Sequence, residues 1–341
     1  MLPLRADLTG LILACALAAA GCGGGESLAT SEPPPTTGPA PTQPLPPDPV
    51  PLPPPEPPLP EPLPTPPAPT PVPPSPAPTH VGMAFGPAQQ PRSQWGPDFN
   101  STVYTAHPDT LLADLEAARR AHLRVFVSFT GNEQHNRDEN GFSLTKWKQR
   151  VDRFRTADLS SYLADGTIIG HFILDEPGDA RNWSGHVVAQ ADIAEMARYS
   201  KEIWPDMPTI IRAWPAFLEG HEYPHLDAVR VQYHARLGDL DEFIRDNVRR
   251  ARGLNLRVVG GLNVLNGGGA ESELPPWAER RYPMDPGQLR EWGRRYLAEP
   301  DLCAFVLWEY ENSYFALPEV KAALADLSRQ AAALPARSCA R

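Results

Sequence analysis

The sequence lacks several features, and each absence narrows the range of functions. Basic residues are too few to attract a polyanion: 31 Lys and Arg stand against 41 Asp and Glu, and the net charge is −10. We therefore expect neither a nucleic-acid partner nor binding to an anionic membrane by charge. Long hydrophobic runs are missing too, because the apolar stretch Leu11–Ala20 is too short for a transmembrane helix.

Cysteine is also scarce, with four residues in the chain. One of them, Cys22, follows Ala19-Ala20-Gly21 and the apolar stretch. This run resembles the lipobox of bacterial lipoproteins, in which the Cys becomes lipidated and N-terminal. The resemblance implies a signal peptide over residues 1–22 and a membrane anchor at Cys22, with the rest of the chain extracytoplasmic in the cell envelope. Cys22 is followed by Gly23 rather than Asp, which in lipoproteins favours the outer over the inner membrane. A plain secretory signal is the alternative to a lipid anchor.

Proline, in contrast, is abundant. Most of its 43 copies lie between Pro33 and Pro78. Such a tract cannot bury a core and favours an extended polyproline II conformation. We expect residues 23–79 to be a disordered stalk that holds a domain away from a membrane, or else a proline-rich ligand for a partner.

From residue 80 to residue 341 the composition is that of a globular domain, and short apolar runs alternate with segments of helical period. Strands joined by crossover helices pair in parallel, and eight such units close into a (β/α)₈ TIM barrel, an α/β fold. An open doubly wound sheet is the competitor, but no Gly-rich turn follows the first strand. The expected strands are His80–Phe85, Ser101–Thr105, Leu123–Phe129, Thr167–Leu174, Thr209–Ala213, Ala228–His234, Leu256–Val264 and Cys303–Trp308. One expected helix begins at Pro108. The others are Ser143–Ala164, His186–Ile203, Asp239–Arg252, Pro286–Leu297 and Pro318–Ala332.

The barrel topology brings two cysteines together. Cys303 begins the eighth strand at the barrel floor, and Cys339 lies just beyond a last helix that must return to that floor. An exported domain sits in an oxidising compartment. We therefore predict a disulfide between them.

The fourth expected strand ends in two adjacent carboxylates. It reads GTIIGHFILDEPGD, with Asp175 and Glu176 at the end where active sites of this fold lie. LDEP here resembles the Asn-Glu-Pro or Asp-Glu signatures of TIM-barrel glycoside hydrolases, and Trp308 in VLWEYEN resembles the sugar-platform tryptophan of those enzymes. The resemblance implies a carbohydrate substrate and Glu176 as the general acid/base. A pair that merely ends the strand is the plainer interpretation.

Glycoside hydrolysis usually needs a second carboxyl group. The seventh strand, RVVGGLNVLNGGGA, offers Asn263 but no acid, so Glu309 is one candidate. In chitinase-like barrels the substrate's 2-acetamido oxygen attacks instead; Asp175 would orient it, and Tyr233 resembles the tyrosine that contacts the acetamide. Successive strand residues point to opposite faces, so Asp175 and Glu176 both reach the barrel mouth only if the strand end twists or bulges.

Further polar and aromatic residues at strand ends suit a carbohydrate cleft, since sugars stack on rings while their hydroxyl groups seek donors and acceptors. We expect substrate contacts from Asn132, Glu133, Arg212, Trp214, His234 and Asn263. HEYPH, from His221 to His225, has the letters of a zinc-protease motif, but Pro224 is incompatible with the helix that this motif needs. No cofactor or metal is implied. The alternatives are a barrel that binds glycan without cleaving it and a metal-dependent hydrolase; the sugar and the oligomeric state stay open.

Overall fold

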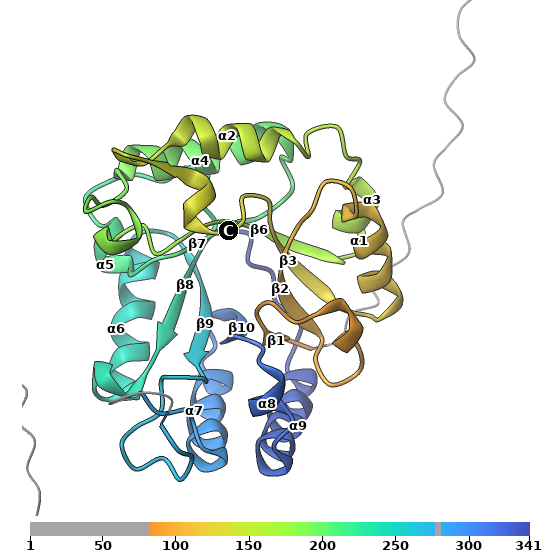
Figure 1. Cartoon of the computed structure of the whole chain (residues 1–341), viewed down its shortest axis with the longest axis vertical. Helices are drawn as coiled ribbons and strands as arrows, with labels where there is room; N and C mark the ends of the chain where they lie inside the picture. Colours follow the sequence, from red (N-terminus) through yellow and green to blue (C-terminus); the bar gives the residue numbers. More distant parts are fainter. Residues whose placement is uncertain (1–81, 277–280) are drawn as a thin grey trace, which may run out of the picture. The chain divides into compact units, whose positions relative to one another are not determined.

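In the computed structural model, residues 82–276 and 281–341 are described, and their strands form one ring (Figure 1). The expected signal peptide, Cys22 and the proline-rich stalk lie outside these residues. All neighbouring strands pair in parallel, in the order β1-β10-β9-β8-β7-β6-β3-β2. The strands are β1 (Ala84–Pro87), β2 (Ser101–Thr105), β3 (Arg124–Ser128), β6 (Ile168–Asp175), β7 (Thr209–Arg212), β8 (Ala228–Tyr233), β9 (Arg257–Asn263) and β10 (Leu302–Trp308).

The ring closes between β1 and β2. Ala88 forms a parallel bridge with Val103, and the backbone N–H of Gln89 donates to the carbonyl oxygen of Val103 at 2.9 Å. At the other end of the same seam, the N–H of Asn100 donates to the carbonyl of Phe85 at 3.2 Å. The fold is therefore the expected (β/α)₈ TIM barrel and not an open sheet.

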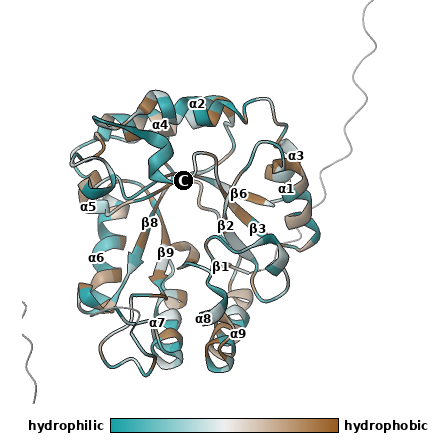
Figure 2. Ribbon diagram, viewed as in Figure 1, coloured by the Kyte–Doolittle hydropathy of each residue, from teal (hydrophilic) through white to brown (hydrophobic). Residues whose placement is uncertain are grey.

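Helices surround the ring and bury apolar faces against it (Figures 1 and 2). The expected helix Ser143–Ala164 is wrong as one element: it is two, with the break at residues 153–159. Asp158 accepts hydrogen bonds from the N–H and hydroxyl of Ser160, and such local bonds compete with a continuing helix. The helices are α1 (Leu111–Arg120), α2 (Leu144–Asp152), α3 (Ser160–Ala164), α4 (Gln190–Ile203), α5 (Pro215–Leu218), α6 (Leu240–Gly253), α7 (Pro286–Ala298), α8 (Asn312–Phe315) and α9 (Pro318–Ala333). A small antiparallel pair, β4 (Arg137–Asp138) and β5 (Gly141–Phe142), lies in the loop after β3.

The first strand begins later than expected, at Ala84 rather than His80. Gly82 has φ +81° and packs so closely on the end of α9 that a Cβ would lie 2.5 Å from the Cα of Ala332. The chain bends there, and extended pairing starts only after the bend.

The barrel floor is covered by the C-terminal segment. Cys303 and Cys339 form a disulfide with a Cα–Cα distance of 5.1 Å, which confirms the predicted pair. Both sulfur-bearing residues are buried in the apolar cluster that fills the barrel interior. The backbone N–H of Arg341 donates to Asp227 at the start of β8. Among the described helices, none is long and apolar enough to cross a bilayer.

Candidate active site

A cavity of about 1090 Å³ opens at the C-terminal ends of the strands. Residues from all eight strands or the loops that follow them line it, as expected for the active face of this fold. The acidic residues in its lining are Glu133, Asp175, Glu176 and Glu309.

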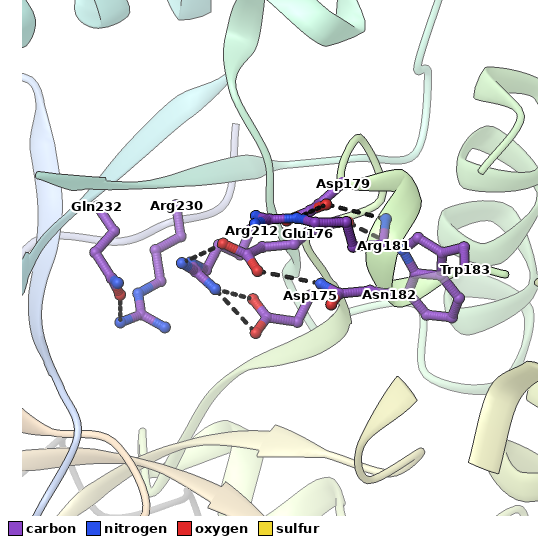
Figure 3. Close-up of polar contacts among 9 residues, drawn as sticks. All are labelled: Asp175, Glu176, Asp179, Arg181, Asn182, Trp183, Arg212, Arg230 and Gln232. Atoms are coloured by element: carbon purple, nitrogen blue, oxygen red, sulfur yellow. Dashed lines mark hydrogen bonds and ion pairs between the residues drawn. The ribbon is translucent and has the colours of Figure 1, made fainter. Parts of the chain in front are cut away.

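Asp175 and Glu176 are held by one guanidinium group (Figure 3). Nη1 of Arg212 lies 3.0 Å from both carboxylate oxygens of Asp175, and Nη2 lies 2.6 Å from Oε1 of Glu176. Arg212 ends β7, the strand that pairs with β6, so the parallel register places it beside Asp175. Burial acts to lower the pKa of Arg212, but the charges of Asp175 and Glu176 outweigh it and the pKa lies above its ordinary value.

The end of β6 is irregular, and this brings both acids to the cavity. The register between β6 and β7 shifts between Phe172 and Leu174, and Glu176 has φ +40°, in the left-handed region that non-glycine residues rarely adopt. The indole N–H of Trp183 donates to the Glu176 carbonyl at 2.9 Å, and the Asn182 amide donates to Oε2 of Glu176 at 3.2 Å. The bulged strand end that the acids needed is therefore present.

Two other carboxyl groups lie in a different electrostatic environment. Burial and the nearby charge of Asp175 raise the pKa of Glu309. Burial raises the pKa of Glu133 as well, and the charges of Asp175 and Glu176 add to it. The cavity thus combines carboxylates bound to a cation with carboxyl groups whose pKa is raised.

Trp308 forms the apolar wall beside these acids. The guanidinium carbons of Arg212 and Arg230 each lie 5.7 Å from the centre of its ring. The peptide bond between Trp308 and Glu309 is cis. An aromatic ring beside charged groups can stack on the apolar face of a sugar while those groups bind its hydroxyl groups.

Most of the residues expected from the sequence line this cavity. Besides the acids they are Asn132, Arg212, Trp214, His234, Asn263 and Trp308. Burial, followed by the charge of Arg236, lowers the pKa of His234 to about 4.

Tyr233 is the exception, and the expected contact with an acetamide group is wrong for this position. Its ring packs outside the barrel strand against Phe243 and Trp292, and its hydroxyl donates to the carbonyl of Gly238 at 2.6 Å. Successive residues of β8 face opposite sides, so Gln232 and His234 point to the cavity while Tyr233 points away.

The same alternation identifies residues that sequence reasoning missed. In VRVQYHAR the polar residues Arg230, Gln232 and His234 recur every second position between apolar neighbours, which indicates a polar face toward the barrel interior. Arg230 is 1 % exposed and donates through Nη2 to Oε1 of Gln232 at 3.0 Å. Asn182 ends a short 3₁₀ helix, Ala180–Asn182, in the loop after β6, and no sequence pattern marks it.

The segment with the letters of a zinc-protease motif lies in the loop after β7. HEYPH is not helical there, and no group of three or more His, Cys, Asp or Glu side chains in residues 82–276 and 281–341 could hold a metal ion. The segment is therefore not the helix that a zinc-protease motif needs, as Pro224 predicts.

Comparison with known proteins gives similarity at the level of fold. A scan against protein-family models gives no match, and a search of curated proteins gives none. Among solved structures, a β-D-glucuronidase from Dictyoglomus thermophilum is similar with a TM-score of 0.48 and 11% identity; the match covers 72% of this chain and 46% of that one. The xylanase TsXylA from Thermoanaerobacterium saccharolyticum has a TM-score of 0.44 and 14% identity, and the match covers 68% of this chain and 87% of the xylanase. A chitinase from Pseudoalteromonas aurantia has a TM-score of 0.41 and 12% identity, and the match covers 67% of this chain and 92% of the chitinase. This chain thus spans less than half the length of the glucuronidase, and the likeness in all three cases concerns the fold alone.

Proposed function

We propose that the cavity binds a saccharide and hydrolyses a glycosidic bond by carboxylate catalysis. The observation that carries this proposal is the contrast between neighbouring acids in one cavity: Glu176 accepts hydrogen bonds from Arg212 and Asn182, whereas the pKa of Glu309 is raised. Glycoside hydrolysis needs one carboxyl group that donates a proton and a second that acts as base or nucleophile. Environments that differ in this way assign these two roles to different residues.

In this proposal Glu309 protonates the leaving oxygen, because burial and the charge of Asp175 raise its pKa. Glu176, which contacts Arg212, is the partner that activates water or attacks the anomeric carbon. The role of general acid, which the sequence resemblance implies for Glu176, thus belongs to Glu309 in this proposal. Trp308 supports the sugar ring, and Asp175 with Arg212 holds Glu176 in place.

A barrel that binds glycan without cleaving it is the second candidate. Arg212 contacts both carboxylates at the end of β6, and β9 ends in Asn263 where an acid would be needed for the ordinary double displacement. A carboxylate that stays bound to Arg212 is less available for attack on an anomeric carbon. Turnover distinguishes the two candidates.

The test is hydrolysis of a panel of oligosaccharides by the wild type and by the variants Glu176→Gln and Glu309→Gln. Removing either catalytic carboxyl group should lower kcat by at least about 100-fold, the usual size of a general acid–base contribution. Glu202→Gln is the matched control, since Glu202 lies on α4 in an exposed ion pair with Arg198. Binding of a glycan with no turnover by the wild type would establish the second candidate, and turnover that survives Glu176→Gln would remove Glu176 from the mechanism.

We also propose that the chain is an exported lipoprotein anchored through Cys22. The lipobox-like sequence supports this, and so does the disulfide between Cys303 and Cys339, since disulfides persist in oxidising compartments. Metabolic labelling with a radioactive fatty acid should label the wild type and not Cys22→Ala. Equal labelling of the two would contradict the anchor at this cysteine.

A further inference from the structure

The cavity is positively charged although the chain as a whole is negative. Its lining contains seven arginines and four acidic side chains; with Asp179, the partner of Arg181, included, two positive charges remain in excess, while the chain has a net charge of −10. Two of the arginines are paired with acids: Arg212 with Asp175 and Glu176, and Arg181 with Asp179.

The other arginines of the lining form no ion pair with any residue of the described chain; they are Arg150, Arg153, Arg230, Arg236 and Arg281. Two of them are anchored through a backbone carbonyl instead: Arg150 donates to Thr130 at 2.6 Å and Arg236 donates to Asn266 at 2.8 Å. These bonds hold the guanidinium groups at the cavity wall and leave their charges uncompensated.

Positive charges also crowd together on one wall. Burial and the nearby Arg153 lower the pKa of Arg150, and burial with the charges of Arg150 and Arg153 lowers the pKa of His135. Like charges in contact raise the free energy of a site until an anion binds between them. Arg150, which is fixed to the carbonyl of Thr130, and Arg153 both line the cavity and therefore give this wall a positive charge that can attract an anion.

Arg230 gives the same indication from the depth of the cavity. It is 1 % exposed, lies 5.8 Å from the ring centre of Phe172, and makes one hydrogen bond, to Gln232. Its Nε and Nη1 atoms are buried without a hydrogen-bond partner among the described residues. A guanidinium group offers five N–H donors, and burying it unpaired is costly. Figure 3 shows Arg230 beside Arg212, whose guanidinium bears two carboxylates while that of Arg230 bears none.

We propose that the cavity selects an acidic saccharide, one whose sugar ring carries a carboxylate or a sulfate group. Arg230 binds this group in the depth of the cavity, and Arg150 and Arg153 add attractive positive charge at the cavity wall. The inference rests on the proposed function for the reaction but not for the binding. A planar guanidinium matches carboxylate and sulfate oxygens in a two-pronged geometry, and a ring on Trp308 lies next to Arg230. Carboxylate and sulfate share this chemistry, and the test separates them.

The test measures binding of the full chain in detergent by calorimetry to three matched oligosaccharides: one neutral, one with uronic acids and one O-sulfated. At low salt we expect at least about tenfold tighter binding of one acidic member than of the neutral one, and loss of this preference as salt rises. Arg153→Gln should weaken acidic binding roughly threefold, the effect of one partly screened charge, and weaken neutral binding by less. Arg230→Lys keeps the charge but loses the planar fork, and it should weaken acidic binding about tenfold.

The matched control is Arg329→Gln, on the exposed face of α9 and 72 % exposed, which removes one charge from the chain outside the cavity. Equal affinity for the neutral and acidic members, or losses in Arg153→Gln that are the same for both, would overturn the inference. Hydrolysis is recorded on the same sugars, so the two proposals fail separately. Binding of acidic sugars without cleavage would refute the proposed hydrolysis and support the proposed acidic specificity. Cleavage of neutral sugars alone would support hydrolysis and refute the acidic specificity.

Discussion

Removing the Arg212 side chain should destabilise the fold measurably. In Arg212→Met the carboxylates of Asp175 and Glu176 lose their shared cation. The side chains of Arg212 and Asp175 are 14 % and 21 % exposed, so this contact is worth about 2 kcal/mol, in the range of hydrogen bonds between charged groups. Glu176 is 39 % exposed, and water screening limits its contact to about 1 kcal/mol. With two carboxylates left side by side, the total loss should be about 3–4 kcal/mol.

Urea unfolding of the full chain, followed by circular dichroism, measures this loss as a change in the free energy of unfolding. Adding Asp175→Asn to Arg212→Met should recover about 1 kcal/mol, because a neutral amide leaves no charge without a partner. The control Arg329→Met removes an exposed arginine and should stay within about 0.5 kcal/mol of the wild type. An Arg212→Met variant as stable as this control would refute the reasoning that one buried cation holds the two acids.

Three further changes test other parts of the structure. Replacing Cys303 and Cys339 by Ala removes a cross-link between residues 36 positions apart and should cost about 3–4 kcal/mol in urea unfolding, whereas no change would mean that the thiols are not joined. The raised pKa of Glu309 implies that its contribution to stability is present below its unfolded pKa and lost as pH rises through its folded pKa. Glu309→Gln should therefore raise the free energy of unfolding more at pH 7 than at pH 4. The reverse order would contradict the raised pKa. Asp239 caps α6 by accepting from the N–H of Glu242 at 2.8 Å, so Asp239→Ala should cost about 1 kcal/mol, and a loss below about 0.3 kcal/mol would show that the cap is unimportant.

The strands could be predicted from sequence because parallel strands buried on both faces are continuous apolar runs. β6 and β10 have this pattern, and their order along the chain determines which ends meet at the cavity. Topology alone also predicted the disulfide, since it places Cys303 and the chain after α9 on the same floor. The split between α2 and α3 was missed, because its cause is a local bond from Asp158 that a helical period does not reveal.

The site was predicted less completely. Asp175, Glu176 and Glu309 could be located because each ends or follows a buried strand. The contact that Asp175 and Glu176 share with Arg212 depends on the register between two strands. The orientation of Tyr233 could have been predicted from the sequence, because alternation along β8 places Tyr233 and Arg230 on opposite faces of the strand. The charge of the cavity had no such signal, because its arginines are dispersed over loops and strands far apart in the sequence.

The most direct test of the proposed mechanism is how the activity of Glu309→Gln depends on the leaving group. With a saccharide substrate that the wild type cleaves, aryl glycosides of the same sugar are prepared with leaving phenols of low and high pKa. If Glu309 donates the proton, the variant should retain near wild-type kcat on the most acidic phenol and lose at least about 100-fold on the least acidic, while Glu176→Gln loses activity on both. Equal loss in Glu309→Gln across all phenols, or undiminished activity in Glu176→Gln, would contradict the division of roles between these two carboxyl groups.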